Sequence, residues 1–338
     1  MQSLQNIEQI FHVAFGYMAS KALFSGLHLG VFDAVAEGPK SLEALTRETG
    51  AEERGLETLL TALTSIGLLE KSEAGWTNGP ATQEHLLSGG PGNFGDYCRY
   101  QIDRQMYPFM HNLTDVLLGR RDTVPFQDYE EWFNDAAEAS LYSESQHSAS
   151  IGPALLLGAQ VDLSGHRRLL DIGGGSGAFS ITLCQQHPEL RSTILDFPNV
   201  LEVGRRHVEK AGLESRIDLL PGNALDTDWP GAQDVVLFSY VSGSVSAEGV
   251  AEFYRRAWSA LEPGGIVLVH DFMVDDDRTG PPLTAIWALQ HATFTPGAVS
   301  LTPGFVTGLL EKIGFAEASI ADFVPGMTRL VHARKPPA

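Results

Sequence analysis

Apolar residues recur every three or four positions through the first 90 residues, a spacing that predicts helices rather than strands. The clearest series runs from Ile7 to Ala19 and from Leu56 to Leu63. Ser41 stands as an N-cap residue before a further apolar stretch, and residues 66–77 read as a turn followed by a small hairpin. Helices followed by such a hairpin predict a winged-helix-like domain over residues 1–90.

The pattern changes after residue 165, where short apolar runs alternate with amphipathic stretches. The strand-like runs are residues 169–172, 193–197, 217–220, 234–240 and 266–272, with a closing hairpin over 318–324 and 329–333. One intervening helix is expected over 247–261, ending in the turn 262–265. This alternation predicts an α/β fold with a mainly parallel, doubly wound sheet over residues 161–338.

Ligands of such sheets bind at the carboxyl ends of the strands. The residues predicted at that edge are Asp171, Gly173, Asp196, Asn223, Ser239, Tyr240 and His270. The intervening segment, residues 91–160, is rich in aromatic residues and arginine, and it is predicted to form a helical linker and a substrate lid.

A glycine-rich run, DIGGGSG (residues 171–177), follows the first strand and precedes an amphipathic stretch. Its spacing is not G-x-G-x-x-G, and no Gly-Lys-Ser/Thr follows, so few donors would face a pyrophosphate. Asp196 ends the next apolar run, where a carboxylate can hold two ribose hydroxyls. These features favour a nucleoside cofactor without phosphates, S-adenosylmethionine.

Composition narrows the possible partners. The 338 residues carry a formal net charge of −19, which disfavours nucleic acid and anionic membranes as partners. The helix expected at 53–63 carries one Arg and several acids, so a DNA-regulator role for the winged-helix-like domain is disfavoured and a packing or dimer-forming role is preferred. No long apolar run and no export signal are seen, and Cys98 and Cys184 lack metal-type spacing, so a cytoplasmic protein is expected.

Four stretches together resemble a known family: LDIGGGSG (170–177), TILDFP (193–198), PGNA (221–224) and LEPGG (261–265). The whole chain resembles small-molecule methyltransferases of the acetylserotonin O-methyltransferase type. The resemblance implies a Rossmann-like methyltransferase sheet, an N-terminal dimerisation domain, a homodimer and bound S-adenosylmethionine. The cofactor-binding residues expected are Asp171, Gly173, Gly174, Gly175, Asp196, Phe197, Asn223, Ala224, Ser239 and Tyr240.

One departure from the family concerns the catalytic base, which the family carries as the His of a His-Asp-Trp triplet. An ungapped alignment of residues 234–257 places Gly243, Ser244 and Val245 at that triplet. Because a positioned base contributes about 10²–10⁴-fold to proton removal, three explanations remain open. The acceptor has no proton to lose, the base is relocated, or methyl transfer is lost.

An acceptor without such a proton is a thioether. The family includes a marine bacterial branch that S-methylates 4-methylthio-2-hydroxybutyrate in dimethylsulfoniopropionate synthesis, and this chain resembles that branch. S-methylation of this acid by direct transfer is therefore the leading prediction, with catalysis resting on alignment. The substrate-binding residues expected are Arg99, Arg104, Tyr107, Tyr142, His147 and His291.

The alternatives are an O- or C-methyltransferase and a protein that retains S-adenosylmethionine without transferring its methyl. His291 is the candidate base of the first alternative, and His270 is a second catalytic candidate, although a structural role is weighed for both. His270, Asp271 and His291 also resemble a metal set, but neighbouring strand residues point to opposite faces, so no metal is predicted.

Overall fold

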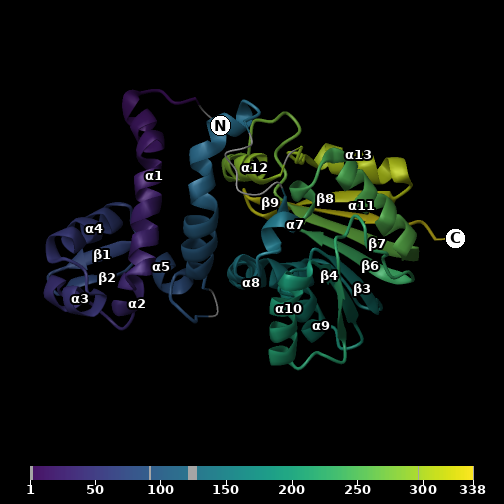
Figure 1. The fold of residues 1–338 in the computed structure, drawn as a ribbon, viewed down its shortest axis with the longest axis horizontal. Coiled ribbons are helices and arrows are strands. Elements are labelled where there is room, and N and C mark those ends of the chain that lie inside the picture. Colours follow the sequence, from purple (N-terminus) through teal and green to yellow (C-terminus); the bar gives the residue numbers. More distant parts are fainter. Residues whose placement is uncertain (1–2, 91–92, 121–127, 296, 338) are drawn as a thin grey trace. The chain divides into compact units, whose positions relative to one another are not determined.

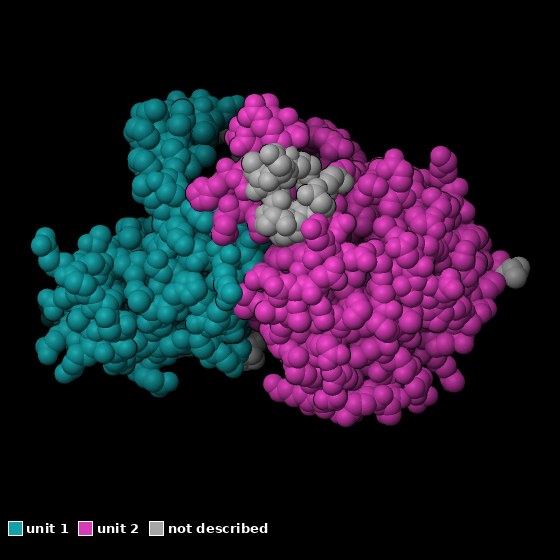
Figure 2. Space-filling model, in the orientation of Figure 1, with its two compact units in different colours: residues 1–107 teal, residues 108–338 magenta. Residues whose placement is uncertain are grey.

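The computed structural model describes residues 3–90, 93–120, 128–295 and 297–337. The chain divides into two compact units, residues 1–107 and 108–338, which Figure 2 shows in different colours. Each unit is described by itself. Of the predicted lid segment, residues 91–92 and 121–127 lie outside the described residues.

The N-terminal unit is helical and carries one small hairpin, as predicted. Its elements are α1 (Ile7–His28), α2 (Val31–Ala34), α3 (Leu42–Thr49), α4 (Glu53–Ser65), β1 (Leu69–Ser72), β2 (Gly75–Asn78), α5 (Pro80–His85) and η1, a π-helix (Tyr97–Met106) (Figure 1). Ser41 caps α3 by accepting the backbone N–H of Ala44, and Gly50, at φ +68°, ends it. Leu45, Leu56, Leu60 and Leu63 are buried together and hold α3 against α4.

The first half of α1 carries apolar side chains that this unit leaves exposed. The exposed fractions are 62% for Ile7, 49% for Phe11, 71% for Val13 and 54% for Phe15. Phe11 and Phe15 stack with ring centroids 5.7 Å apart. Ile7, Phe11 and Phe15, spaced four residues apart, share one side of the helix, and an exposed apolar face of this kind is typical of an interaction surface.

The C-terminal unit is built on a seven-stranded sheet. Its strands are β3 (Arg168–Ile172), β4 (Arg191–Asp196), β5 (Ile217–Pro221), β6 (Gln233–Ser239), β7 (Leu261–Asp271), β8 (Ala316–Val324) and β9 (Thr328–Arg334). Their order is β5-β4-β3-β6-β7-β9-β8, and β9 alone runs antiparallel to its neighbours. The strand order reverses between β3 and β6, which is where a doubly wound sheet binds its ligand.

Helices cover both faces of this sheet (Figure 1). The helices of the C-terminal unit are α6 (Leu113–Leu117), α7 (Tyr129–Phe133), α8 (Ala136–Gln160), α9 (Ala178–Gln186), α10 (Pro198–Ala211), α11 (Ala247–Ala260), α12 (Pro282–Phe294) and α13 (Pro303–Ile313). The 3₁₀ turns are η2 (Tyr107–Asn112), which begins at the last residue of the N-terminal unit, and η4 (Ser242–Ser244). Among the helices described, none has both the length and the apolar character needed to span a bilayer.

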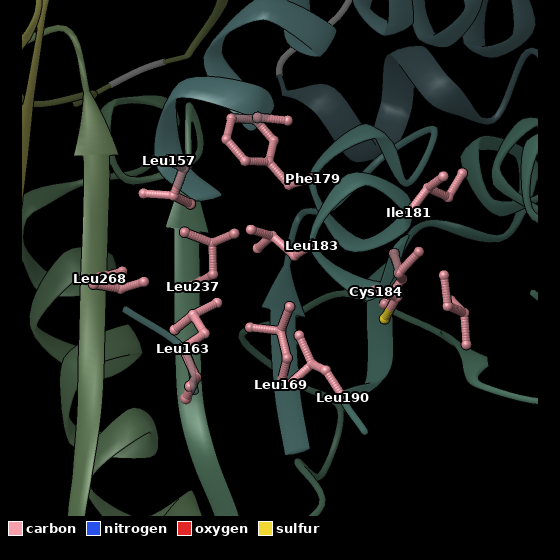
Figure 3. Close-up of a cluster of buried hydrophobic side chains, with 14 of the residues drawn as sticks. Leu157, Leu163, Leu169, Phe179, Ile181, Leu183, Cys184, Leu190, Leu237 and Leu268 are labelled. Atoms are coloured by element: carbon pink, nitrogen blue, oxygen red, sulfur yellow. The ribbon is translucent and has the colours of Figure 1, made fainter. Parts of the chain in front are cut away.

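Successive strand residues feed two separate cores, one on each face of the sheet. Leu169 and Leu237 belong to the core shown in Figure 3, whereas their neighbours Leu170 and Phe238 belong to the opposite core. Because both faces are covered, the central strands read as continuous apolar runs rather than as alternating ones. The α/β fold and the N-terminal helical domain predicted from the sequence are thus confirmed.

One expected boundary is wrong. The helix predicted to end at Leu261 ends at Ala260, and the predicted turn 262–265 lies within the extended strand β7. Leu261 pairs with Gln233 on β6, and a register shift follows before the regular pairing resumes at Val235. Strand pairing therefore begins earlier than the Pro-Gly-Gly signal indicated.

Candidate active site

The glycine turn between β3 and α9 has the backbone that only glycine adopts easily. Gly173 and Gly175 have φ values of +66° and +58°. A Cβ on Gly173 would lie 2.7 Å from Cγ2 of Val241, and a Cβ on Gly174 would lie 2.6 Å from Cγ of Asp171. The turn therefore presents backbone atoms without side chains, so that a ligand can approach the main chain closely. We call residues 173–175 the glycine cradle.

Asp196, at the end of β4, holds this turn in place. Its Oδ2 accepts the N–H of Gly175 at 2.8 Å, and its Oδ1 accepts the N–H of Phe197 at 2.7 Å. Burial raises the pKa of Asp196 to about 6, and these two backbone donors oppose the rise. Each carboxylate oxygen keeps a further lone pair, as hydroxyl recognition requires.

Asp171, at the end of β3, has an unused acceptor. Its Oδ2 accepts the Ser180 hydroxyl at 2.6 Å, whereas its buried Oδ1 has no partner among the described residues. Burial raises the pKa of Asp171 to about 7. A cradle of bare backbone with a free buried acceptor fits the predicted S-adenosylmethionine, which carries donors and no phosphate.

The segment after β5 closes the same edge. Asn223 donates from Nδ2 to Oε2 of Glu130 at 2.6 Å and accepts the N–H of Leu225, while the carbonyl of Ala224 accepts the indole N–H of Trp229. Glu130 belongs to α7, and Asn199 donates to the carbonyl of Phe133 in the same helix. These bonds fasten α7 to the carboxyl ends of β4 and β5.

Aromatic rings of α7 and α8 gather beside this edge. Tyr142, predicted as a substrate contact, packs against Phe133 with ring centroids 4.9 Å apart, and Phe133 lies 6.1 Å from Phe197. Trp132 stacks on Phe133 at 5.2 Å. Tyr142 therefore lies in an aromatic cluster next to Phe197, a predicted cofactor residue.

His147 lies over the glycine turn. Its Nδ1 is 2.9 Å from the hydroxyl of Ser176, and its ring stacks on that of His207 with centroids 3.6 Å apart. His207 and Arg206 both contact the carboxylate of Glu144. Burial, followed by the nearby His207, lowers the pKa of His147 to about 4. This geometry favours a role in shaping the cofactor turn over the predicted role in binding substrate.

Three predicted substrate residues belong to the N-terminal unit. Arg99 donates to Asp96 at 2.7 Å, with its guanidinium over the ring of Tyr100, and Arg104 is exposed. The ring of Tyr107 lies 6.1 Å from that of Phe24, edge to face. Their roles toward substrate stay predictions.

His270 is enclosed between two hydroxyls. Its Nδ1 is 3.0 Å from Oγ of Ser239 and its Nε2 is 2.9 Å from Oγ1 of Thr328, and the residue is 0% exposed. Tyr240, at φ +59°, places its ring 4.4 Å from the imidazole. Burial lowers the pKa of His270 to about 3, so the ring is neutral. This arrangement favours a structural role for His270 over a catalytic one. Ser239 and Tyr240, both predicted as cofactor residues, contact its imidazole.

Gly243 opens a cavity of about 120 Å³ at the end of β7. A Cβ on Gly243 would lie 3.5 Å from Oδ1 of Asp271 and 3.6 Å from Nε2 of His291. The Nδ1 of His291 is buried and has no partner among the described residues, and burial lowers the pKa of this imidazole to about 4. The predicted relocated base thus lines a cavity beside the position of the missing one.

Two carboxylates of the acidic run at residues 275–277 bind other parts of the C-terminal unit. Asp275 binds Arg329 at 2.6 Å, and Asp276 accepts the N–H of Gly304 near the start of α13. No group of three or more His, Cys, Asp or Glu side chains close enough to hold a metal occurs in the described part of the chain. His270 and Asp271 bond in different directions, toward Thr328 and Gly243 respectively.

Sequence reasoning missed Glu130, Ser176 and Asn199, whose bonds tie helices to the cofactor edge. Nothing in their spacing signals these long-range contacts. Asp271 was weighed only as a metal ligand, although it ends an apolar strand as Asp171 and Asp196 do. That shared position was the available signal.

Comparison with known proteins agrees with this geometry. A model of the O-methyltransferase domain matches residues 112–316, and a model of the O-methyltransferase dimerisation domain matches residues 11–88. A 3-hydroxy-5-methyl-1-naphthoate 3-O-methyltransferase of Streptomyces sahachiroi is 30% identical over 94% of this chain and 92% of its own length.

Solved structures show the same fold. The S-adenosylmethionine-dependent methyltransferase SibL, in its apo form, has a TM-score of 0.79 and 29% identity, covering 98% of this chain and 100% of that one. Human N-acetylserotonin methyltransferase in complex with SAM has a TM-score of 0.86 and 24% identity, covering 99% and 100%. The chain therefore belongs to the O-methyltransferase family and is an S-adenosylmethionine-dependent methyltransferase.

Proposed function

We propose that this enzyme methylates the sulfur of a thioether acid, with 4-methylthio-2-hydroxybutyrate as its acceptor. The observation that carries the proposal is Gly243, which stands where the family resemblance places the catalytic base and has no side chain. The space beside it is a cavity, lined in part by His291 and Asp271. A thioether sulfur accepts a methyl group without losing a proton, so its methylation needs no base.

S-adenosylmethionine, when bound, supplies a methyl group on a positively charged sulfur, and that C–S bond breaks as the acceptor's bond to the methyl carbon forms. The acceptor sulfur loses no proton and gains the positive charge. The residues expected to hold the cofactor are those at the ends of β3, β4 and β5, above all Asp171, Asp196 and Asn223. These residues fix the position of the cofactor relative to the acceptor, and alignment of the reacting atoms is the main source of the rate enhancement in such a transfer.

His291 is a poor general base in this setting. A base works best when its pKa lies near the working pH, and burial lowers that of His291 to about 4. Asp271 is also constrained, because its two oxygens accept the N–H groups of Gly243 and Phe272. His291 therefore lacks the pKa of an efficient replacement for the missing base. Burial raises the pKa of Asp271 to about 7, which suits a base, but both of its oxygens are already engaged by backbone donors.

O-methylation is the second candidate, and the relatives favour it. The Streptomyces sahachiroi relative is named for transfer to the 3-hydroxyl of a naphthoate. In this chain, His291 would then be the base, through the Nε2 that lies 3.6 Å from the position of a Cβ on Gly243.

The deciding experiment measures release of S-adenosylhomocysteine from the full-length enzyme. The acceptors are 4-methylthio-2-hydroxybutyrate and 3-hydroxy-5-methyl-1-naphthoate, at pH 7, 8 and 9. We expect turnover of the thioether acid that changes less than threefold with pH and persists in His291→Asn. Turnover of the naphthoate alone, lost in His291→Asn, would establish the second candidate.

A third result would overturn both candidates. If neither acceptor is turned over by enzyme that calorimetry shows to bind S-adenosylmethionine, the protein retains its cofactor without transferring the methyl group to these acceptors. The thioether-acid proposal would then be rejected.

We also propose that the enzyme is a homodimer that pairs through α1. The match to the dimerisation domain covers most of α1, and Phe11 and Val13 leave their apolar side chains exposed there. Val13→Asp should convert the dimer to a monomer in sedimentation velocity, whereas Glu43→Gln on the exposed face of α3 should not. A dimer that survives Val13→Asp and Phe11→Asp together would place the interface elsewhere.

A further inference from the structure

A carboxylate in the interior of the C-terminal unit lacks a counter-charge. Asp271 is 2% exposed, and its two oxygens accept the N–H groups of Gly243 at 3.0 Å and Phe272 at 2.8 Å. No Lys, Arg or His among the described residues forms an ion pair with it. Buried charges in proteins are normally paired, so a ligand is the natural source of the missing positive charge.

The described groups packed around Asp271 do not supply this positive charge. Arg329 stands opposite Asp271 in the β7–β9 register, but its guanidinium binds Asp275 at 2.6 Å. Tyr254 on α11 directs its hydroxyl to Ser242, and Tyr240 packs on His270. His291 on α12 is neutral, because burial lowers its pKa to about 4.

Asp271 also faces open space. It lines the cavity of about 120 Å³ together with Gly243, His291, Phe272 and Trp287. The rings of Phe272 and Trp287 stack with centroids 4.7 Å apart and planes 23° from parallel. A carboxylate and aromatic rings around one small cavity form the kind of surrounding that attracts a compact organic cation.

The cavity adjoins the cofactor turn. Val241 touches the position of a Cβ on Gly173, and Gly243 lines the cavity two residues further along the same loop. A methyl acceptor in the cavity would therefore lie next to the cradle predicted for S-adenosylmethionine.

We propose that Asp271, Phe272 and Trp287 form a sulfonium-binding site, in which the Asp271 carboxylate stabilises the positive charge as it develops on the acceptor sulfur. This inference rests on the proposed thioether acceptor and deepens it. It also gives Gly243 a physical role, since the missing side chain leaves room for the sulfur and its methyl groups beside the carboxylate.

The proposal predicts a link between cation binding and pH. Burial raises the pKa of Asp271 to about 7, so the group is about half protonated at neutral pH when the cavity holds no cation. A bound sulfonium favours the ionised carboxylate and lowers that pKa. Affinity for the cation should therefore rise with pH, by about tenfold between pH 6 and pH 8.

The experiment is calorimetric titration of the full-length enzyme saturated with S-adenosylhomocysteine, which keeps the probes out of the cofactor site. The probes are 4-dimethylsulfonio-2-hydroxybutyrate and 4-methylthio-2-hydroxybutyrate, which share a carboxylate and differ in the charge on sulfur. We expect the affinity ratio of sulfonium to thioether to rise about tenfold from pH 6 to pH 8 in the wild type. A ratio that does not change with pH would overturn the proposal.

Two variants locate the effect. Asp271→Asn should abolish the pH dependence of the ratio, whereas Asp218→Asn, which makes the same change on the exposed side of β5, should keep it. Persistence of the full pH dependence in Asp271→Asn would assign it to another group and overturn the proposal. If Asp271→Asn does not fold, the wild-type ratio together with Trp287→Leu, expected to lose at least threefold in sulfonium affinity alone, decides the question.

Failure of the proposed function has a different signature. If neither acid binds, the thioether acceptor is wrong, and trimethylsulfonium becomes the probe. Binding of this ion that rises with pH in the wild type and is lost in Asp271→Asn would support the cation site by itself. Absence of such binding would reject the site as well.

Discussion

Two glycine-containing regions of the C-terminal unit, the turn after β3 and Gly243 in η4, differ in what the absence of a side chain does. At Gly173 and Gly174 a Cβ would lie less than 3 Å from neighbouring side chains, and the carboxylate of Asp196 fixes the turn by accepting the N–H of Gly175 at 2.8 Å. At Gly243 the missing side chain leaves a cavity, and Asp271 faces it without a cationic partner among the described residues. The first region is held in shape by hydrogen bonds within the protein. The second, under our proposal, is completed by a bound cation.

The comparison predicts that the two regions fail separately. Asp196→Ala removes the acceptor that holds Gly175 and the expected partner of the ribose hydroxyls, and hydrogen bonds to a charged group are worth about 1.5–3 kcal/mol each. We expect affinity for S-adenosylmethionine to fall about 100-fold in calorimetry. Asp218→Ala, an exposed carboxylate on β5, is the matched control and should change the affinity less than twofold.

A smaller effect, on binding of the acceptor, is expected from a substitution at the cavity beside Gly243. Gly243→Leu would fill the cavity between Asp271 and His291, since even a Cβ at this position lies 3.5 and 3.6 Å from them. The KM of the thioether acid should rise about 30-fold, which corresponds to about 2 kcal/mol of lost acceptor binding. Steady-state kinetics with the acceptor varied would measure it.

The control for this variant is the cofactor. Affinity for S-adenosylmethionine should stay within twofold of the wild type, and Gly243→Ala, whose Cβ meets only ordinary contact distances, should be mild in both assays. Equal losses of cofactor and acceptor binding in Gly243→Leu would mean that the two regions are one energetic unit, and the comparison would no longer hold.

The same contrast explains how far the sequence could be read. The turn 171–177 and Asp196 are local signals, because strand, glycine run and strand-end acid are adjacent in the chain, and the fold follows from the alternating pattern around them. The cavity depends on Gly243, Asp271, Trp287 and His291, which come from three separate segments. The sequence indicated only that the family's base is missing at Gly243. The cavity itself depends on tertiary packing, which periodicity does not encode.

The bonds made by α7 and α8 were equally invisible in the sequence. Residues Glu130 and Asn223 are 93 positions apart, and no short motif relates them. Aromatic richness in 91–160 indicated a lid, and the described part of it places Phe133 beside Phe197. The lid stays a prediction, and the aromatic pattern gave no indication of where this segment is attached to the sheet.

The mildest test concerns the contact between α8 and the cofactor turn. His147→Ala removes the 2.9 Å bond to the Ser176 hydroxyl, and one neutral hydrogen bond is worth about 1 kcal/mol. We expect about a fivefold loss of affinity for S-adenosylmethionine. Ser176→Ala should lose a similar amount, and the double variant should lose little more than either, because both substitutions break one bond.

The pH dependence of the free energy of unfolding tests the burial of His147 independently. Burial, reinforced by His207, lowers the pKa of His147 to about 4, below its ordinary value of 6.5. The unfolded chain therefore takes up a proton first as pH falls, and the wild type should lose about 1–2 kcal/mol more than His147→Ala between pH 7 and pH 5. Equal losses in the two proteins would mean that His147 is not buried on the turn, and the glycine cradle would then be held by Asp196 alone.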